Sequence, residues 1–282
     1  MPPLTVSALH VYPLKSCRGL SLDRATVGRM GLQYDRQWMF VDERGMFVAQ
    51  RGDGRLGVEV RTLCLVRTAL AGGLLRVTAP DMPPLELPLA GLAGAEVPVQ
   101  VWQSRTIGID QGPEAEAWAT TYLGRERPGR YRLVRMPDEG HRLSKKGPAE
   151  LAFADGYPFL IISEASLEDL NRRLAEPLPM NRFRPNIVLR GCAPYGEDTL
   201  DALRIGSVEL MGMPLCPRCP IPTTNQETGE RGKEPLRTLA TYRRGEDGSV
   251  LFGRNFSHRT EGEIAVGDEA VHVQGAAVRS SA

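Results

Sequence analysis

The sequence lacks an apolar run long enough to cross a membrane. No uninterrupted apolar stretch reaches about 18 residues, the length at which a transmembrane helix becomes a candidate. The N-terminal stretch MPPLTVSALHVYPLK also lacks a basic segment followed by an apolar core and a small-residue cleavage site, which a secretory signal would need. We therefore expect no membrane span, no N-terminal membrane anchor and no secretory leader.

Charge of one sign and paired cysteines are also scarce. The chain has 35 basic and 34 acidic residues and a net charge of +1, whereas a nucleic-acid-binding domain usually has a basic face and a high pI. Its five cysteines are an odd number spread over a long chain, which does not predict a disulfide framework. Free thiols fit a reducing compartment. We therefore expect a cytoplasmic protein that does not bind nucleic acid.

What the sequence does contain is typical of a globular protein. Apolar residues make up 41% and charged residues 24%, so a buried core is expected. A length of 282 residues favours two domains, with one large β-rich unit as the alternative.

The first part of the chain has the pattern of short strands. Apolar runs are separated by Gly, Pro and Asp at spacings of roughly 8–12 residues, as in a barrel or sandwich. Residues 58–63 alternate between apolar and polar, which predicts a strand with two different faces. Residues 1 to about 110 are therefore predicted to be mostly β, with strands at 8–14, 37–41, 57–66, 74–78 and 97–102.

Helical signals begin after this β-rich part. Pro113 starts an apolar face of helical period that Gly124 ends, which predicts a helix between them. The Arg-, Pro-, Gly- and Lys-rich residues 125–146 predict a loop. Ser166, with Asp169 three residues later, resembles a capping box and predicts a second helix start.

Strand character surrounds this second helix. The predicted strands are 159–162 before it and 186–190, 208–212, 250–256 and 270–273 after it. The predicted fold class is therefore α+β and β-rich, with a first domain at residues 1–115 and a second at 116–282. The boundary is placed only to within 110–155.

The segment with the clearest chemistry contains Cys216 and Cys219. Thiols at this spacing can chelate zinc, cycle as a disulfide or leave one thiolate free for another metal. A zinc site usually needs a second ligand pair, which neither the other cysteines nor the histidines form. A thioredoxin-type pair needs a helix N-terminus, whereas Pro217, Pro220 and Pro222 favour extended backbone here. Two buried cysteines without function are the remaining alternative.

Basic residues near predicted strand ends suggest an anion site. Arg218 lies beside the thiols, and a neighbouring guanidinium favours the thiolate that binds metal. Lys15 with Ser16, Arg36 and Arg184 also lie beside strands. Each alone is typical of a solvated charge, but a barrel mouth could gather them around one anion. From the residues alone, the chain is predicted to be a β-rich anion-binding protein with a reactive thiol.

Several longer motifs resemble a known family. They are Val11-Tyr-Pro-Leu-Lys-Ser-Cys-Arg-Gly19, Asp35-Arg-Gln-Trp38, Ser163-Glu-Ala-Ser166, Phe183-Arg-Pro-Asn-Ile-Val188, Cys216-Pro-Arg-Cys219 with Thr223-Thr224, Lys233-Glu-Pro-Leu236 and Leu251-Phe-Gly253. In this order they resemble the MOSC superfamily, the C-terminal domain type of molybdenum cofactor sulfurase. Within it they are similar to the mitochondrial amidoxime-reducing component and its bacterial relatives. The resemblance runs from about residue 7 to about residue 273.

This resemblance implies a fold and a cofactor. The fold would be a MOSC N-terminal β-barrel domain followed by a MOSC β-barrel domain with a few helices. The cofactor would be the molybdenum cofactor, Mo-molybdopterin, with Cys219 as the thiolate ligand of the metal. The other positions carried over as cofactor-binding are Lys15, Ser16, Arg36, Asp155, Gly156, Tyr157, Arg184, Asn186, Arg218 and Asn255.

The chain departs from the mitochondrial relatives at two places. They have Thr-Ser where this chain has Gly156-Tyr157, and Tyr where it has Asn255. Both changes concern the shape and polarity of the pocket more than metal binding. The chain also shows no four-cysteine iron–sulfur signature of the kind that some bacterial relatives carry at their C-terminus.

The implied function is reduction of N-hydroxylated or N-oxide small molecules by a molybdenum enzyme. Electrons would come from a separate donor protein of the ferredoxin, flavodoxin or cytochrome-type reductase class. A sulfur or molybdenum-cofactor carrier, with a persulfide on Cys219, is the first alternative. A thiol redox protein that uses both Cys216 and Cys219 without molybdenum is the second.

Overall fold

The computed structural model describes residues 3–52, 56–91, 94–140, 142–144 and 150–273. Within these ranges, strands predominate over three short α-helices, which confirms the predicted β-rich α+β fold class. None of the helices in the described ranges is long and apolar enough to cross a membrane.

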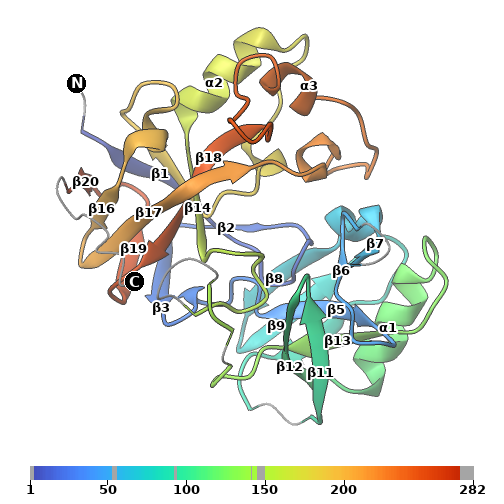
Figure 1. The fold of residues 1–282 in the computed structure, drawn as a ribbon. Coiled ribbons are helices and arrows are strands. Elements are labelled where there is room, and N and C mark those ends of the chain that lie inside the picture. Colours follow the sequence, from blue (N-terminus) through green and yellow to red (C-terminus); the bar gives the residue numbers. More distant parts are fainter. Residues whose placement is uncertain (1–2, 53–55, 92–93, 141, 145–149, 274–282) are drawn as a thin grey trace.

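The upper body in Figure 1 is built around one large mixed sheet. In the described part of the chain, its strand order is β2 (Leu20–Leu22), β1 (Thr5–Val11), β15 (Ile187–Arg190), β14 (Phe159–Ser163), β18 (Leu251–His258), β17 (Val208–Pro217), β16 (Ala202–Ile205) and β20 (Ala270–His272). Only the pairing of β14 with β15 is parallel in this sheet. A smaller sheet of β19 (Gly262–Ala265), β3 (Arg24–Gly28) and β4 (Gly31–Leu32) shares its core. The helices α2 (Glu164–Arg173) and α3 (Leu236–Leu239) lie at the top of this body (Figure 1).

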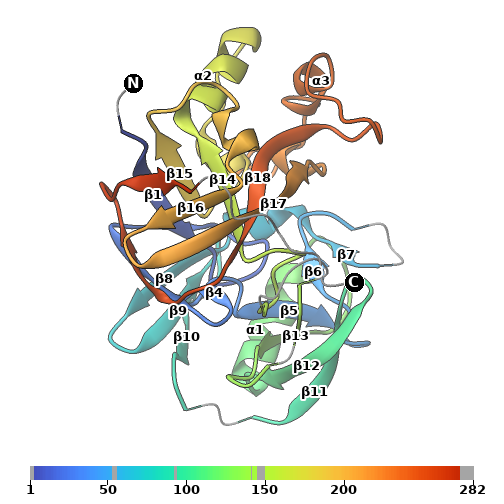
Figure 2. The ribbon, with the colours of Figure 1, turned by 60° about the vertical axis from the view of Figure 1, so that its left-hand side comes forward.

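The lower body contains three smaller groups of strands and one helix. They are the sheet of β11 (Glu96–Val101), β12 (Ser104–Asp110), β13 (Tyr131–Arg135) and β5 (Trp38–Asp42), the sheet of β10 (Leu85–Pro88), β9 (Leu74–Thr78) and β8 (Arg67–Ala71), the pair β6 (Val48–Ala49) and β7 (Val58–Glu59), and α1 (Pro113–Leu123). Its core is separate from that of the upper body and centres on buried aromatic residues such as Trp38, Phe40 and Trp118. Figure 2 shows the two bodies stacked one on the other.

The chain passes between the two bodies more than once. Strand β1 pairs antiparallel with β15, far along the sequence, so the first strand belongs to the upper body. Directly after it, Leu14 bridges Trp38 of the lower body, and the N–H of Lys15 donates to the Trp38 carbonyl at 2.8 Å. The segment from Tyr12 to Ser16 therefore crosses the seam between the bodies. Residues on this crossing can meet side chains from both halves of the sequence.

Helix α1 forms as its sequence predicts. Pro113 takes the first helical position, where its missing N–H costs no hydrogen bond, and Glu114 and Glu116 lie in the first turn, near the positive end of the helix dipole. Trp118 and Tyr122 are on the buried face, and the helix ends at Gly124. The predicted helix is confirmed.

Residues 57–66 do not form the predicted strand. Only Val58 and Glu59 pair with β6, and the chain then turns into the 3-10 helix η1 (Arg61–Leu65). The Glu126 carboxylate accepts from the N–H of Arg61 at 2.9 Å and from the N–H of Thr62 at 3.0 Å. A carboxylate distant in sequence thus satisfies the free donors of this turn, which the local alternation of apolar residues could not indicate.

Two further local predictions are wrong. The N-cap of α2 is Ser163, whose hydroxyl accepts from the Ser166 N–H at 3.1 Å, so Ser166 lies inside the helix. The buried Glu197 carboxylate accepts from the Ser166 hydroxyl at 2.8 Å, and this tertiary contact explains why both serines are buried. In the predicted loop 125–146, residues 131–135 form β13 against β5. Residues 141, 145 and 146 of that loop lie outside the described ranges.

Candidate functional site

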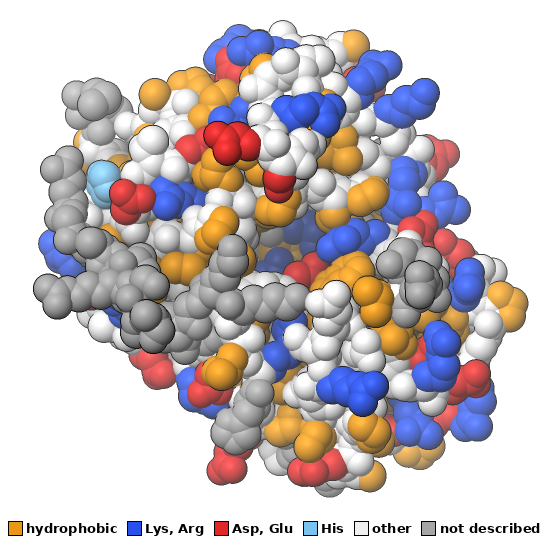
Figure 3. Space-filling model, viewed as in Figure 1, with side chains coloured by type: hydrophobic (Ala, Val, Ile, Leu, Met, Phe, Trp, Pro, Cys, Tyr) orange, Lys and Arg blue, Asp and Glu red, His pale blue; other side chains and the backbone are white. Residues whose placement is uncertain are grey.

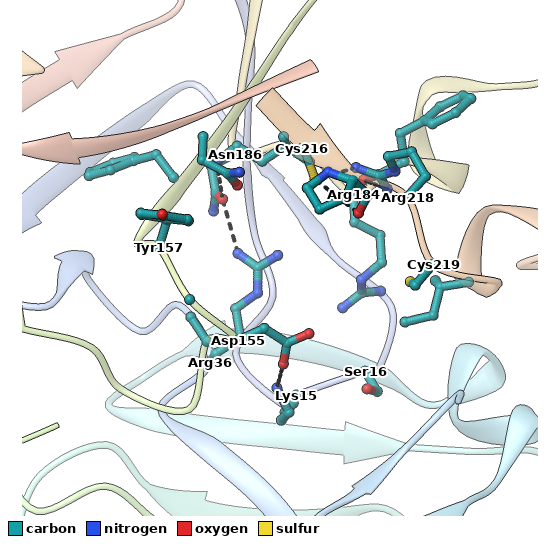
Figure 4. A pocket seen from close by; sticks show the side chains of 18 of the residues that line it. Lys15, Ser16, Arg36, Asp155, Tyr157, Arg184, Asn186, Cys216, Arg218 and Cys219 are labelled. Atoms are coloured by element: carbon teal, nitrogen blue, oxygen red, sulfur yellow. Dashed lines mark hydrogen bonds and ion pairs between the residues drawn. The ribbon is translucent and has the colours of Figure 1, made fainter. Parts of the chain in front are cut away.

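A cavity of about 430 Å³ lies at the seam between the two bodies. Figure 3 shows the hollow from outside, with Lys and Arg side chains in its depth. All eleven residues that the sequence predicted for the site line this cavity: Lys15, Ser16, Arg36, Asp155, Gly156, Tyr157, Arg184, Asn186, Arg218, Cys219 and Asn255. The structure therefore brings the whole predicted set together, and what each residue binds stays a prediction. Figure 4 shows how the main side chains face the cavity.

The backbone is strained where several of these residues attach. Ser16, Arg36 and Arg184 have φ angles of +66°, +50° and +59°, and Trp102, which also lines the cavity, has +53°. A side chain with a Cβ rarely adopts this left-handed region, at a cost of about 1–3 kcal/mol for each residue. Such strain persists only where the surrounding structure imposes it, and it clusters at binding sites. Backbone strain at four lining residues therefore indicates that the cavity is a binding site.

Lys15 and Asp155 form an ion pair at the cavity wall. Lys15 is buried, and its Nζ also donates to the Phe153 carbonyl at 2.8 Å. Burial lowers the pKa of Lys15 to about 8, although the Asp155 carboxylate opposes this shift. Burial also acts to raise the pKa of Asp155, but the charges of Lys15 and Arg51 outweigh it and hold that pKa well below its usual range. The two cations keep this carboxyl ionised at neutral pH.

Arg36 is fixed by contacts with two side chains. Its guanidinium forms an ion pair with the buried Asp35, and its Nη1 donates to Oδ1 of Asn186 at 3.0 Å (Figure 4). The Asn186 amide is itself held in place, because Nδ2 donates to the His10 carbonyl at 3.2 Å and Oδ1 also accepts from the Leu160 N–H at 3.2 Å. Asn186 therefore orients Arg36 from the sheet, and Arg36 is the group that can reach a ligand.

Arg184 is a buried cation that forms no ion pair within the described part of the chain. Its Nη1 donates to the Cys17 carbonyl at 2.6 Å, and no carboxylate of the described residues forms an ion pair with it. Burial lowers the pKa of Arg184, but a guanidinium stays protonated at neutral pH. A buried charge with no counter-ion is costly. An anionic ligand would offset that cost.

The thiol that Arg218 contacts is Cys216. Nη1 of Arg218 lies 3.2 Å from Cys216 Sγ, and Nη2 donates to the Phe183 carbonyl at 2.8 Å. Burial raises the pKa of Cys216, and Arg218 opposes that shift. Cys219 lies on the cavity wall and is partly exposed (Figure 4). The sequence indicated a guanidinium beside a thiol, and the structure shows that this thiol is the first of the two.

The prolines around the two cysteines do not all keep the chain extended. Strand β17 continues to Pro217, but Pro220 has helical backbone angles and begins the 3-10 helix η4 (Ile221–Thr223). The chain thus leaves the sheet between the two thiols. This turn places Cys216 at the end of a strand and Cys219 at the start of a loop.

Gly156, Tyr157 and Asn255 also line the cavity. At Gly156 an added Cβ would meet nothing within 4 Å, so the cavity has room for a side chain there. Tyr157 is partly exposed beside it, and burial raises the pKa of its hydroxyl. Asn255 Nδ2 donates to the Pro214 carbonyl at 2.9 Å, in the stretch where the pairing of β17 and β18 shifts register.

Sequence reasoning missed two lining residues from the lower body. Trp102 lies in the two-residue turn between β11 and β12, and the Arg51 guanidinium lies 4.2 Å from the centre of its ring. Nη2 of Arg51 is also 3.4 Å from Oδ2 of Asp155. Arg51 lies beside the short strand β6, as the predicted basic residues lie beside strands, so the same signal could have found it.

Among the described residues, no group of three or more His, Cys, Asp and Glu side chains is placed to hold a metal ion. Within those residues, no third His, Cys, Asp or Glu side chain is placed to share a metal ion with Cys216 and Cys219.

Comparison with known proteins gives consistent matches over nearly the whole chain. The MOSC N-terminal beta barrel domain matches residues 3–126, and the MOSC domain matches residues 148–271. Mitochondrial amidoxime reducing component 2 of Rattus norvegicus is 37% identical over 287 residues, covering 94% of this chain and 82% of the relative. Mitochondrial amidoxime-reducing component 1 is 36% identical in both Mus musculus and Homo sapiens, again with 94% of this chain covered and 81% of each relative.

Proposed function

The chain belongs to the MOSC family, and we propose that it is a molybdenum-cofactor-dependent reductase of N-hydroxylated or N-oxide small molecules. One observation carries the proposal: a partly exposed thiol, Cys219, shares a cavity with five cationic side chains and one carboxylate. The curated relatives named as amidoxime-reducing components support the reaction class.

The residues present fit an anionic cofactor. Arg184 is buried without a carboxylate partner among the described residues, as shown above. The Nε atoms of Arg51 and Arg218 are buried without a hydrogen-bond partner in the same part of the chain. Buried donors are nearly always satisfied in folded proteins. A ligand with several acceptor oxygens, such as a phosphate group, would satisfy donors of this kind.

Each lining group has a proposed part in holding the cofactor. Cys219 would supply the thiolate that ligates molybdenum, because soft metals prefer sulfur. Lys15, Ser16, Arg36 and Arg184 would bind the pterin and its phosphate through charge-assisted hydrogen bonds. When bound, the molybdenum cofactor supplies the two-electron redox chemistry that removes oxygen from the substrate.

The remaining contacts orient these groups. By binding both Cys216 and the Phe183 carbonyl, Arg218 ties the segment that carries Cys219 to the segment that carries Arg184. Asp155 holds the Lys15 ammonium in place, and Asn186 holds Arg36. The protein would therefore present its thiol and its cations from a preformed frame.

We further propose that the electrons come from a separate donor protein of the ferredoxin, flavodoxin or cytochrome-type reductase class. The word "component" in the names of the relatives supports a multi-protein system. Reduction of an amidoxime by the purified chain would then require an added donor, artificial or protein.

The experiment that tests the function compares the wild type with Cys219→Ala and Cys216→Ala. All three are produced in a host that makes molybdenum cofactor, and metal and fluorescent pterin are measured before an amidoxime is supplied with an artificial electron donor. We expect the wild type and Cys216→Ala to hold near-stoichiometric molybdenum and to reduce the substrate. Cys219→Ala should lose the metal and the activity.

The alternatives give different patterns in the same experiment. A sulfur carrier, which the partly exposed Cys219 thiol would also suit, would show no turnover and a persulfide on that residue. A thiol redox protein would need both cysteines and no molybdenum. Retention of metal and turnover in Cys219→Ala would reject the proposed ligand.

A further inference from the structure

A buried tyrosine lies against two guanidinium groups beside the cavity. The Tyr12 ring centre is 4.3 Å from the Arg36 guanidinium carbon and 4.2 Å from that of Arg184. Figure 4 shows the two guanidinium groups apart from one another, each facing the cavity. One ring thus contacts both guanidinium groups. Tyr12 is only 3% exposed and is not itself a lining residue.

The ring of Tyr12 is held on several sides. Its hydroxyl donates to the Pro185 carbonyl at 3.0 Å, and its backbone N–H donates to Oδ1 of Asp35 at 2.8 Å. An added Cβ at Gly19 would come within 2.5 Å of the ring, so that glycine lets the chain pack directly on it. The Tyr12 carbonyl accepts from the Arg36 N–H at 2.8 Å. The ring therefore has little freedom to move.

These contacts tie the ring to both arginines through the backbone as well. Pro185 directly follows Arg184, and Asp35 directly precedes Arg36 and forms an ion pair with it. Each arginine has a left-handed backbone conformation, which aims its side chain. The tyrosine thus contacts both the guanidinium and the adjoining chain of each arginine.

The Tyr12 ring also offsets the repulsion between the two guanidinium groups. Two guanidinium groups beside one cavity repel each other, and only Arg36 of the two has a carboxylate among the described residues. An aromatic face is electron-rich and attracts a cation. A ring in contact with two cations therefore attracts both, and these two contacts limit how far apart the cations can lie. An aliphatic side chain of similar size would fill the space without the attraction.

We propose that Tyr12 is a positioning residue that holds Arg36 and Arg184 at a fixed separation, so that together they bind one phosphate group. This inference rests on the proposed function only in naming that phosphate as part of the cofactor. The recognition itself needs only a tetrahedral oxyanion, whose oxygens can accept from two guanidinium groups at once.

The test measures binding of inorganic phosphate to the full chain produced without molybdenum cofactor. Titration calorimetry compares the wild type with Tyr12→Phe, which keeps the ring, and Tyr12→Leu, which removes it. The matched control is Tyr122→Leu. Tyr122 is another buried tyrosine, 4% exposed, whose hydroxyl donates to the Thr62 carbonyl at 3.0 Å, but it does not line the cavity.

We expect Tyr12→Phe to bind phosphate within about twofold of the wild type and Tyr12→Leu to bind at least about tenfold more weakly, as for a lost charge-assisted contact. Tyr122→Leu should be less stable to urea yet bind phosphate normally. A second readout is the interaction between Arg36→Lys and Arg184→Lys, measured as a double-mutant cycle for phosphate affinity. In the wild type, the loss of phosphate affinity in the double variant should differ from the sum of the two single losses. In the Tyr12→Leu background, the two losses should simply add.

Three results would overturn the inference: absence of phosphate binding by the wild type, normal binding by Tyr12→Leu, or an equal loss in Tyr122→Leu. None of these depends on turnover. A chain that binds phosphate through this pair but holds no molybdenum would keep the inference and reject the proposed reductase. If the chain is a molybdenum reductase but Tyr12→Leu does not change its phosphate affinity, the proposed function stands and the inference about Tyr12 is rejected.

Discussion

The two walls of the cavity differ in how their charges are balanced. On one wall, which we call the paired wall, Lys15 and Arg51 both contact the Asp155 carboxylate. On the other, the open wall, Arg184 and Arg218 donate to carbonyl oxygens and to the Cys216 sulfur, and no carboxylate of the described residues pairs with them. Each cation of the paired wall has a carboxylate partner within the protein. The cations of the open wall have none among the described residues, and the thiol of Cys219 lies on this wall (Figure 4).

Because of this difference, we expect substitutions on the paired wall to affect mainly the stability of the protein and substitutions on the open wall to affect mainly anion binding. A charge removed from the paired wall leaves a partner without its counter-ion, which costs stability. A charge removed from the open wall takes away a group that the folded protein bears at a cost, so stability should not fall. The same change should remove affinity for an anion. The following predictions test this contrast, beginning with the largest expected effect.

The largest effect is expected for Arg184→Met on the open wall. Loss of one charge-assisted contact of about 1.5–3 kcal/mol should weaken phosphate binding by roughly ten- to a hundredfold. The free energy of unfolding of the cofactor-free chain should stay the same or rise. Calorimetric titration and urea unfolding measure the two quantities.

The control for this prediction is Arg182→Met. Arg182 is equally buried and its Nε donates to the Pro222 carbonyl at 2.7 Å, but it does not line the cavity. Its loss should leave phosphate affinity unchanged. Equal weakening in both variants would contradict the contrast between a lining and a merely buried arginine.

A smaller effect, and one on stability, is expected for Asp155→Asn on the paired wall. The buried Lys15 ammonium would lose its carboxylate, which should lower the free energy of unfolding by about 1–3 kcal/mol. Urea unfolding at neutral pH checks this value. The control Glu263→Gln breaks an exposed pair with Arg24 at 3.2 Å and should cost less than about 1 kcal/mol. If the two variants were equally stable, the paired wall would not be a structural unit.

The third prediction concerns pH. The pKa of Lys15 is lowered to about 8 in the folded chain from 10.5. Between these two values the unfolded chain binds more protons, so the contribution of Lys15 to stability should rise with pH. Its help to anion binding should be lost over the same rise, because the ammonium becomes neutral.

Phosphate titrations at about pH 7 to pH 9.5 test this, across the range where Lys15 loses its proton. Wild-type affinity should fall severalfold through pH 8, whereas Lys15→Met should bind more weakly with a flatter profile. The arginines of the open wall stay charged throughout. A wild-type profile as flat as that of the variant would show that Lys15 does not act on the ligand.

The smallest effect is expected for Arg51→Gln. Arg51 is the second cation on Asp155 and also lies over the Trp102 ring, a contact worth about 0.5–1 kcal/mol. Lys15 would still neutralise the carboxylate, so the loss of unfolding free energy should stay below that of Asp155→Asn. A larger loss would mean that Arg51, not Lys15, is the main partner of Asp155.

How far the sequence predicts the fold depends on where each signal comes from. Helix α1 could be predicted because Pro113, its apolar face and Gly124 act within one segment. The strand predicted at residues 57–66 failed because Glu126, far along the chain, satisfies the N–H groups of a 3-10 turn instead. The cap of α2 was misplaced for a similar reason, since the buried Glu197 carboxylate binds Ser166.

For the candidate site, too, the sequence predicted local features but not the contacts between distant segments. Its residue types and motif order were visible in the sequence, and all the predicted residues line one cavity. Trp102 was missed because its part depends on a contact with Arg51, from a distant segment. The sequence also could not show that Arg218 contacts Cys216, since side-chain direction at a strand end depends on how the strand is held.

By itself, the sequence determined the β-rich class, the local helix signals and the chemistry available to the site, because these follow from residue type and short spacing. The tertiary structure alone decided that β1 joins the upper sheet and that the chain then crosses the seam, which brings Lys15 to Asp155 and Tyr12 to Arg184. It also decided which cations of the cavity have a carboxylate partner, as Lys15 and Arg51 do, and which have none among the described residues. The physical reason is that burial and counter-ions are properties of side chains from distant segments that meet in the folded chain.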